Sequence, residues 1–205
     1  MKRSLDLVIV FIVSPILIVV YPIIALTILL MDGRPILFAQ NRSGKDSKIF
    51  LMYKFRTMDS SSGENLHEEH YKKLAKNTKV EPSLDPSSPI RIENDVRITR
   101  VGNFLRKTSL DELPNIINVL FGNMSLVGPR PLVPYESKLY GEYEDKRNST
   151  IPGITGLAQV QGRTDLSLQE RLFWDIEYIN NKSLLLDISI ILKTIVSVFQ
   201  KRGAI

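Results

Sequence analysis

Residues 7–31 read LVIVFIVSPILIVVYPIIALTILLM, a stretch without a single charged side chain. A helix of about 25 residues can cross a hydrocarbon core of about 30 Å. A core helix of a soluble protein is seldom apolar on every side over that length. A cleaved signal peptide fits poorly, because the apolar run is too long and Asp32-Gly33-Arg34 is not a small-residue cleavage site. The stretch therefore predicts residence in a membrane.

Prolines interrupt this apolar stretch near its middle. Ser14 and Pro15 are followed by Pro22, and each proline removes a backbone hydrogen bond and clashes with the carbonyl four residues earlier. The helix should therefore kink or break, and the Ser14 hydroxyl can bond a carbonyl that is freed. Basic residues lie on both sides, so the positive-inside rule keeps both ends cytoplasmic. A re-entrant helix over residues 1–33 is favoured, and an ordinary kinked spanning helix stays open as the alternative.

The chain after the membrane segment predicts a small β-hairpin followed by helices. Residues 35–40 and 49–56 are rich in strand-forming side chains and flank a turn-rich stretch at 41–47. Helical patterns then follow at 97–107, 113–120, 135–143 and 168–178. We expect these elements to form one cytoplasmic catalytic domain over residues 34–183.

Residues 184–199 form a further apolar pattern that includes Asp187 and Lys193. The segment is too short and too polar to span a membrane comfortably, but an amphipathic helix here could lie in the membrane interface. An ordinary packed C-terminal helix is an equal alternative. The fold class predicted from these patterns is mixed α+β and mainly helical. It comprises a re-entrant N-terminal helix, a small β-hairpin, cytoplasmic helices and interfacial amphipathic helices. Residues 184–205 are the C-terminal amphipathic helix and its tail.

Residues 59–90 differ in character from the rest. They begin with a polar, Ser-rich stretch and end with three prolines, which predicts an exposed excursion. Residues 67–70 read HEEH, but the two histidines are three positions apart instead of the four of a zincin helix, and no third ligand is evident. A solvated helix face is the better interpretation of this stretch.

The overall charge suits anionic partners. The 205 residues carry a net charge of +5, and the sequence pI is about 9.4. Phosphates and anionic lipid headgroups are natural partners of such a chain, although a modest basic excess also serves solubility alone. The absence of cysteine excludes disulfides and thiolate metal sites.

Two adjacent carboxylates are the sharpest candidates for chemistry. Residues 109–115 read SLDELPN, and Pro114 is acceptable in a helix only in the opening turn, so Asp111 and Glu112 should lie where a helix begins. The positive end of a helix favours ionised carboxylates, which leaves one free as a nucleophile and the other free to hold Mg²⁺. A structural alternative stays open, because Ser109 and Glu112 also match a capping box.

Arg130 is the second candidate, within GPRP at residues 128–131. Two prolines restrict the backbone on either side of it, so its guanidinium should be aimed in one direction. A planar, permanently charged group of this kind suits a phosphate or diphosphate. A rigid loop with a surface arginine is the alternative.

A third group of candidates follows PGITG at residues 152–156. Glycines allow close approach of the backbone to a ligand, and the side chains that follow offer hydrogen bonds to a base, ribose or phosphate: Gln159, Gln161 and Arg163. Positive charge is added by Lys54, Arg56, Arg100 and Arg106. Asp175 and Glu177 lie on the next predicted helix, where either supports the site or is a solvated charge.

These motifs, in this order, resemble the monotopic bacterial phosphoglycosyl transferases, also called the bacterial sugar transferase family. The resemblance runs over nearly the whole chain. It rests on Ser14-Pro15, KFRTM at 54–58, SLDELP at 109–114, GPRP at 128–131, PGITG at 152–156, and Asp175 with Tyr178. One such motif would be weak, whereas six in sequence are specific. Residues 59–90 are longer than the corresponding link in the family's smallest members.

The resemblance implies roles for individual residues. Asp111 matches the nucleophile, which attacks the sugar-bearing phosphorus of a UDP-sugar and expels UMP, and Glu112 matches the partner acid that helps to hold Mg²⁺. Arg130 lies in the family's Pro-Arg-Pro element near the diphosphate, and Asp175 matches another important acid. Ser14-Pro15 matches the break that makes the membrane helix re-entrant.

The resemblance therefore predicts an enzyme that moves a sugar-1-phosphate from a UDP-sugar to polyprenyl (undecaprenyl) phosphate, as the first membrane step of glycan assembly. An aspartyl intermediate divides the reaction of two mutually repelling phosphates into two steps, with ping-pong kinetics. Mg²⁺ is the expected cofactor, because hard oxygen ligands are present and thiolates are not. The expected location is the cytoplasmic face of the bacterial inner membrane, with downstream glycosyltransferases as further partners.

Two other classes of protein fit the sequence less well. A membrane-anchored scaffold with an inactive site has no reason to keep both Asp111 and Glu112. A membrane-tethered nucleic-acid binder would need a recognition-helix pattern or aromatic residues interleaved with basic ones, and the sequence has neither. No nucleic-acid partner is therefore expected. Sugar choice depends on a few pocket contacts, so N-acetylated aminosugars, glucose and galactose all remain candidates.

Overall fold

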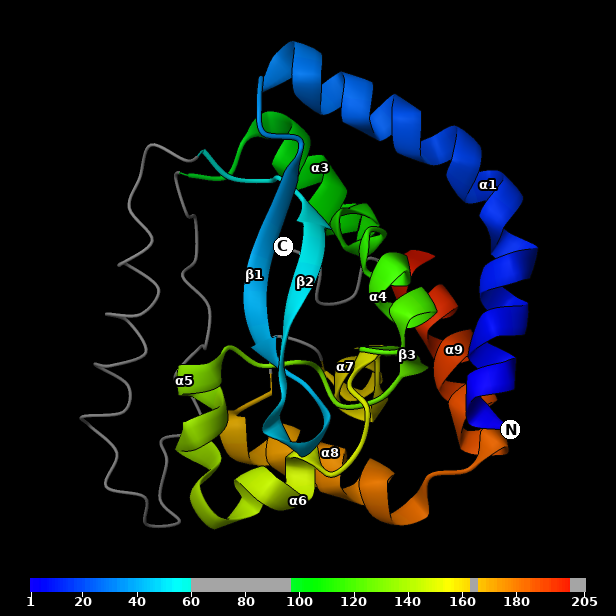
Figure 1. Ribbon diagram of the computed structural model, residues 1–205, viewed down its shortest axis with the longest axis vertical. Helices are drawn as coiled ribbons and strands as arrows, with labels where there is room; N and C mark the ends of the chain where they lie inside the picture. The colour runs from blue at the N-terminus through cyan, green and yellow to red at the C-terminus, as the bar shows by residue number, and fades with distance from the viewer. Residues whose placement is uncertain (60–96, 163–165, 200–205) are drawn as a thin grey trace.

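The computed structural model describes residues 1–59, 97–162 and 166–199, and Figure 1 shows their arrangement. The predicted excursion at 59–90 lies outside the described residues apart from Asp59, and so do the HEEH stretch at 67–70 and Arg163. In the described part, helices predominate, with two sheets of two strands each. The prediction of a mixed, mainly helical fold with a small hairpin is confirmed.

Helix α1 (Lys2–Met31) arches along one side of the molecule (Figure 1). It continues through Pro15 and Pro22, so the prolines coincide with a curved helix and not with two separate helices. The Ser14 hydroxyl donates to the carbonyl of Phe11 at 2.8 Å. Pro15 has no N–H to offer that same carbonyl, so the predicted compensation by Ser14 is confirmed. Among the described helices, α1 alone is long and apolar enough to cross a membrane.

The β-hairpin consists of β1 (Leu37–Ser43) and β2 (Ile49–Phe55), paired antiparallel with Gln40 opposite Met52. The hairpin is confirmed, but its first strand begins two residues later than predicted and includes part of the expected turn. The connection is short because Asp46 and Ser47 both adopt positive φ.

Helices and short strands make up the rest of the described chain. In order they are α3 (Arg100–Thr108), a 3₁₀ turn (Leu110–Glu112), α4 (Asn115–Phe121), β3 (Ser125–Val127), α5 (Pro134–Ser137), a 3₁₀ helix (Lys138–Tyr143), α6 (Glu144–Asn148), β4 (Gly153–Thr155), α7 (Leu157–Gln161), α8 (Leu168–Asn181) and α9 (Leu184–Phe199). The single helix predicted at 135–143 is wrong, because α5 passes at Lys138 into a 3₁₀ helix, within which Gly141 takes a positive φ. The helix predicted at 184–199 is present with those bounds, and the helices predicted at 97–107, 113–120 and 168–178 are present with shifted ends.

Strands β3 and β4 form a parallel pair that the sequence patterns did not predict. Their backbones approach closely at two glycines. A Cβ atom on Gly128 would lie 2.5 Å from the carbonyl oxygen of Ile151, and one on Gly153 would lie 2.0 Å from the nitrogen of Gly128. Glycine at these positions therefore permits the contact that fixes the chain just before Arg130.

Apolar residues of α1 pack on the rest of the molecule near its two ends. Ile24 and Ile28 join a buried cluster with Phe55 of β2 and with residues of α3, while Val10 joins a second cluster with Met52, Val119 and Met124. Between these contacts the side chains are largely exposed, with Phe11 at 79% and Ile18 at 73%. The middle of the arch thus presents apolar side chains to the surroundings.

Polar contacts also fasten the beginning of α1. Lys2 donates to Asp187 of α9 at 2.7 Å and to the Tyr178 hydroxyl of α8 at 3.0 Å. The buried Asp6 carboxylate accepts from the Ser125 hydroxyl at 2.8 Å and from the backbone N–H of Leu126 at 3.1 Å. Arg3 donates to two carbonyls at the end of α4.

A second set of polar contacts fastens the end of α1. The Arg56 guanidinium donates to the carbonyls of Asp32, Gly33 and Arg34, and Thr99 donates to the Asp32 carboxylate at 2.8 Å. A cation suits this place because the carbonyl end of a helix carries partial negative charge. Both ends of the arch are therefore bound to the same body of helices and strands.

Candidate active site

Asp111 and Glu112 lie in the 3₁₀ turn between α3 and α4. Ser109 ends α3 in the left-handed conformation, with φ 57° and ψ 17°, so the chain leaves the helix and forms a separate turn. Helix α4 begins only at Asn115, after Pro114. The two acids therefore do lie in the opening turn of a helix, but it is a short 3₁₀ helix that precedes α4.

The capping-box alternative is also wrong. The Ser109 side chain makes no capping hydrogen bond. Glu112 instead accepts hydrogen bonds on Oε1 from Lys54 of β2 at 2.8 Å and from Arg130 at 2.7 Å. The Glu112 side chain thus links three segments that are distant in the sequence.

The two neighbouring acids experience different electrostatic environments. Burial raises the pKa of Asp111 above its ordinary value, and the charge of Lys54 opposes this effect. Burial would also raise the pKa of Glu112, but the charges and hydrogen bonds of Arg130 and Lys54 hold it well below its usual range. Glu112 is consequently a fixed anion, whereas Asp111 is a poorly solvated carboxylate, 8% exposed, close to cations.

The cations of this site are affected in turn. The Glu112 carboxylate raises the pKa of the Arg130 guanidinium, so Arg130 stays charged. Burial lowers the pKa of Lys54, and Glu112 opposes this shift. Arg106, near the end of α3, adds positive potential that favours ionised Asp111. The structure therefore brings together Asp111, Glu112, Lys54, Arg106 and Arg130, all predicted from sequence.

The loop that carries Arg130 is bound along its backbone. The Gly128 N–H donates to Thr155 of β4 at 2.8 Å, and the Gly153 N–H donates to the Pro129 carbonyl at 2.9 Å. Beyond this point the Arg130 carbonyl accepts Arg147 Nη2 at 2.7 Å. The predicted restriction of the loop by prolines is thus supplemented by hydrogen bonds from other elements.

Asp175 lies behind this loop. It is 3% exposed and accepts Arg147 Nε at 2.8 Å. Burial raises the pKa of Asp175, and Arg147 opposes that shift. The sequence left open whether Asp175 supports the site or is a solvated charge; in the structure it is buried and reaches Arg130 through Arg147.

Three other predicted residues lie away from the two acids in different ways. Arg56 binds the carbonyls at the end of α1. Gln159 lies in α7, and a Cβ atom on Gly156 would be 2.7 Å from its Oε1 and 2.2 Å from the Gly128 carbonyl oxygen, which places Gln159 beside the start of the Arg130 loop. Gln161 is exposed at the end of α7.

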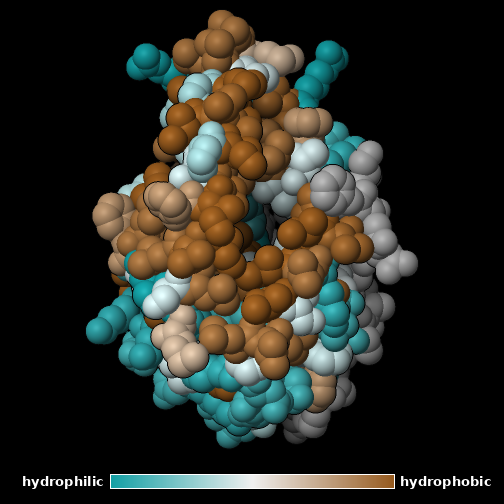
Figure 2. Space-filling model, turned by 90° about the vertical axis from the view of Figure 1, so that its right-hand side faces the viewer, coloured by the Kyte–Doolittle hydropathy of each residue, from teal (hydrophilic) through white to brown (hydrophobic). Residues whose placement is uncertain are grey.

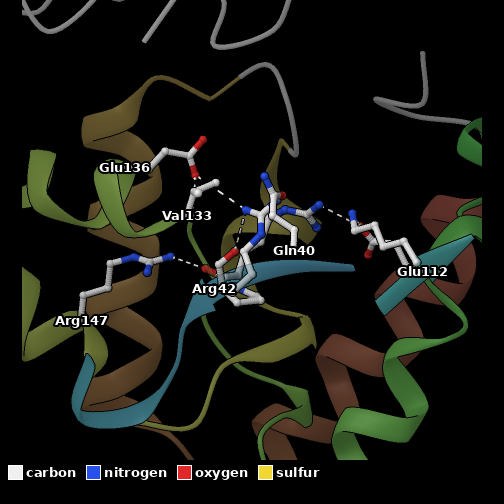
Figure 3. Close-up of polar contacts among 9 residues, drawn as sticks. Gln40, Arg42, Glu112, Val133, Glu136 and Arg147 are labelled. Carbon is white, nitrogen blue, oxygen red and sulfur yellow. Dashed lines mark hydrogen bonds and ion pairs between the residues drawn. The ribbon is translucent and has the colours of Figure 1, made fainter. Parts of the chain in front are cut away.

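Sequence patterns missed two arginines that bind the loop. Arg147 lies in a run of charged residues that is typical of a solvated helix surface, and Arg42 is one of the basic residues that follow the apolar stretch. Arg42 donates to the Pro131 carbonyl at 3.3 Å and lies 3.8 Å from Glu136 (Figure 3). The sequence indicates only that long basic side chains are present at these positions. That does not distinguish a buried ion pair from a charge on the surface.

Carboxylate oxygens are the ligands that Mg²⁺ prefers, and this ion commonly uses one or two carboxylates together with substrate phosphates and water. Both ion pairs of Glu112 use Oε1, so Oε2 and the Asp111 carboxylate are suitable oxygen ligands. Within the described ranges there is no group of three or more His, Cys, Asp or Glu side chains that could hold a metal. The two acids therefore fit a Mg²⁺ ion that is held jointly with a phosphorylated substrate.

Comparison with known proteins gives matches over the whole chain. The family model described as bacterial sugar transferase matches residues 1–201. The chain is 40% identical over 208 residues to the undecaprenyl-phosphate galactose phosphotransferase of Salmonella typhimurium. It is 36% identical over 212 residues to the UDP-glucose:undecaprenyl-phosphate glucose-1-phosphate transferase of Escherichia coli.

These relatives differ in length from the chain. Both alignments cover 100% of this chain but 41% of the relative, so the chain spans about two fifths of the length of these longer proteins. A shorter relative, the exopolysaccharide production protein ExoY of Sinorhizobium fredii, is 36% identical over 207 residues. That alignment covers 99% of this chain and 87% of the relative.

Proposed function

Because this chain belongs to the bacterial sugar transferase family, we propose that it transfers a sugar-1-phosphate from a UDP-sugar to undecaprenyl phosphate and releases UMP. Two similar proteins are named for transfer of galactose phosphate or glucose-1-phosphate in which undecaprenyl phosphate takes part, and a third is named for exopolysaccharide production. The observation that carries the proposal is the position of the buried Asp111 next to Glu112, which Lys54 and Arg130 hold in place.

We propose a reaction in two displacements at one phosphorus atom. An Asp111 carboxylate oxygen attacks the sugar-bearing phosphorus, the bond from that phosphorus to the bridging oxygen breaks, and UMP leaves with that oxygen. A phosphate oxygen of the lipid then attacks the same phosphorus, which releases the Asp111 carboxylate and forms the lipid diphosphate sugar. Division into two steps means that the lipid phosphate never has to approach the intact diphosphate of the donor, and ping-pong kinetics follow from it.

The environment of Asp111 supports its assignment as the nucleophile. A carboxylate that is poorly solvated loses little hydration when it attacks, and the neighbouring cations attract a diphosphate toward it. Arg130 presents a planar guanidinium, which suits the oxygens of a phosphate. Lys54 and Arg106 add positive charge on the β2 and α3 sides. Glu112 keeps Arg130 and Lys54 from moving away, because it bonds both at once.

Mg²⁺ is the proposed cofactor. Glu112 and Asp111 would hold it together with the diphosphate, and the ion would neutralise charge that develops on the transferred phosphate and on UMP. Arg130 and Lys54 would orient the donor, and the burial of Asp111 would keep water away from the nucleophile.

The membrane topology that we propose is re-entrant, with both ends of α1 on the cytoplasmic side of the inner membrane. The contacts of Lys2 and Asp6 at one end and of Asp32 at the other support this arrangement, since all of them join α1 to the same body. A helix that spanned the bilayer would have to carry residues 2–6 to the opposite side and lose their buried partners.

The same topology brings the two acids to the level of the lipid headgroups. Leu110 and Leu113 flank Asp111 and Glu112 and pack against the buried cluster that contains Ile24 and Ile28 of α1. The site thus lies next to the base of the arch, where the phosphate of a polyprenyl lipid would be found. An interfacial position of neighbouring helices is proposed with it.

Exposed apolar side chains next to the arch support this interfacial position. Figure 2 shows apolar surface that continues from α1 onto the adjoining face. On α9 one exposed stripe follows helical spacing, and further large apolar residues are exposed on α3 and α4: Leu185, Ile188, Leu192, Ile195, Val196, Phe104, Leu120 and Phe121. A lipid surface would cover such a set of side chains.

The test is UMP release by the purified full chain in nanodiscs that contain undecaprenyl phosphate, with Mg²⁺ and a panel of UDP-glucose, UDP-galactose and UDP-N-acetylglucosamine. We expect release with at least one donor, loss of release in Asp111→Asn, and unchanged release in Asp145→Asn, which changes an exposed carboxylate of α6. Incubation with the donor alone should leave a sugar phosphate on the peptide that contains Asp111. Activity retained by Asp111→Asn would contradict the nucleophile assignment, and silence with every donor would contradict the activity.

A further inference from the structure

The backbone around Arg130 is held at three consecutive carbonyl groups. The Arg130 carbonyl accepts a hydrogen bond from Arg147 Nη2 at 2.7 Å, and the Pro131 carbonyl accepts one from Arg42 Nη1 at 3.3 Å. The Leu132 carbonyl accepts one from the backbone N–H of Ser43 at 2.8 Å. Carbonyls in a loop are usually satisfied by water or by nearby backbone groups, so two arginines used in this way call for an explanation.

Arg147 is itself fixed on two further sides. Its Nε donates to Asp175 Oδ2 at 2.8 Å, and its guanidinium lies 5.1 Å from the centre of the Tyr140 ring. The side chains of Arg147 and Asp175 are 3% and 4% exposed. Figure 3 shows the Arg147 guanidinium pointing toward the strand and loop that carry the site.

We propose that Asp175 is a positioning residue, which acts through Arg147 on the backbone of Arg130 and so keeps the Arg130 guanidinium on Glu112 Oε1. The kinetic consequence rests on the proposed function, whereas the structural consequence does not. Asp175 would then contribute to turnover without touching the donor or the lipid.

In the observed arrangement, Asp175 does not reach the place where a donor or a lipid phosphate would meet Arg130. Asp175 is 3% exposed, and its Oδ2 is already bonded to Arg147, which occupies the path from Asp175 to Arg130. A guanidinium can make both bonds at once because its Nε and Nη2 groups point in fixed, different directions. A lysine has one nitrogen on a flexible stem and cannot serve both partners with the same geometry.

The first test is a double-mutant cycle on the full chain in nanodiscs, with the UDP-sugar that supports UMP release. Asp175→Asn and Arg130→Gln should each lower kcat by at least about tenfold, because small displacements in a reacting site have large effects. The double variant should be no more than about threefold worse than Arg130→Gln alone, because both changes remove the same interaction. Multiplication of the two effects would overturn the proposal.

Asp187→Asn is the matched control for the loss of a buried acid. Asp187 is 2% exposed and is paired with Lys2 at 2.7 Å, but its partners belong to α1 and α8 and not to the Arg130 loop. Its effect should multiply with that of Arg130→Gln. If the effect of Asp187→Asn on kcat also disappeared in the Arg130→Gln background, the cycle would detect only a general loss of structure. The proposal would then fail.

A second readout needs no substrate. In protein labelled with ¹⁵N-arginine, a guanidinium that is held on a carboxylate gives separate Nη signals in NMR spectra at low temperature, and Arg130→Lys identifies the signal of Arg130 by its loss. We expect the Arg130 signals to average in Asp175→Asn and to persist in Asp187→Asn. Separate Arg130 signals that persist in Asp175→Asn would refute the positioning role, whatever the activity of the chain.

Arg147→Lys covers the case in which Asp175→Asn does not fold. It keeps a buried cation opposite Asp175 but gives up the second bond to the Arg130 carbonyl. The variant should lose the separate Arg130 signals while the protein remains folded. If it keeps them, the bond from Arg147 to Arg130 has no positioning effect.

Discussion

Lys54 Nζ lies 2.8 Å from Glu112 Oε1, although 58 positions separate the two residues in the sequence. This contact joins the second strand of the hairpin to the turn that carries both acids. Arg130 reaches the same oxygen from a third segment. The electrostatic character of the site is therefore set by one carboxylate oxygen that two cations share.

Lys54→Met should lower turnover by about a hundredfold, because it removes one of the preorganised charges near the transferred phosphate. Initial rates of UMP release measure this effect. Lys48→Met, which removes an exposed lysine just before the same strand, is the control and should leave the rate within about twofold. Equal losses in both variants would show that only the overall charge of the chain matters.

The re-entrant topology can be tested with single cysteines, since the chain contains none. Ser4→Cys lies in the first turn of α1, and Lys48→Cys lies in the hairpin connection; both positions are exposed. A membrane-impermeant maleimide should label both from the cytoplasmic side in inside-out vesicles and neither in right-side-out vesicles. Labelling of the two cysteines from opposite sides would establish a spanning helix.

Lys2→Met should lower the free energy of unfolding by about 1–2 kcal/mol, because it leaves the buried Asp187 carboxylate without its cation. The estimate is below that for a fully buried pair, since the Lys2 side chain is 32% exposed and partly screened. Thermal unfolding in nanodiscs gives the measurement. Lys193→Met, on the exposed side of α9, should change the unfolding temperature little.

Ser109 is a position where glycine should be better tolerated than the native residue. Its φ of 57° costs an ordinary side chain about 1 kcal/mol, and the Ser109 side chain makes no capping bond in return. Ser109→Gly should keep or raise stability, whereas Ser109→Val should lower it by about 1–2 kcal/mol and reduce turnover, since the turn positions Asp111. Unfolding temperature and UMP release together check both results. Equal behaviour of the two variants would argue against backbone strain.

Alkaline pH should destabilise the fold through Tyr140. Burial raises the pKa of Tyr140 to about 12 from an ordinary value of 10, so the folded state retains a proton that the unfolded state loses above pH 10. The stabilisation is complete below pH 10 and is lost as the pH rises toward 12, by on the order of 2–3 kcal/mol. Tyr140→Phe should flatten this part of the stability curve. An unchanged curve would mean that another group dominates the alkaline loss.

Local patterns in the sequence predicted the elements that local physics determines. The apolar segment with Ser14-Pro15, the hairpin, and the chemical candidates Asp111, Glu112 and Arg130 all follow from residue type and short spacing. The parallel pair of β3 and β4 was not predictable in this way, because each strand has three residues and the pairing is non-local. Its strands show no alternation that could distinguish them from loops.

The positions of buried charges were also beyond the reach of the sequence. Arg147 and Arg56 both read as surface charges or phosphate ligands, yet each bonds backbone carbonyls in the structure. Which carbonyls lack partners depends on how distant segments meet, and no local pattern encodes that. The capping-box interpretation of Ser109 and Glu112 failed for the same reason, since Glu112 finds stronger partners in Lys54 and Arg130.

The binding of α1 to α9 has a consequence for how the chain matures during synthesis. Lys2 and Asp187 are 185 positions apart, and translation at about 5–20 residues per second separates them by roughly 10–40 s. On the proposed re-entrant topology, α1 would enter the bilayer before Asp187 is available to Lys2. Lys2 can pair with Asp187 only after α9 has been made, so this contact reports the completion of docking between α1 and the described part of the chain.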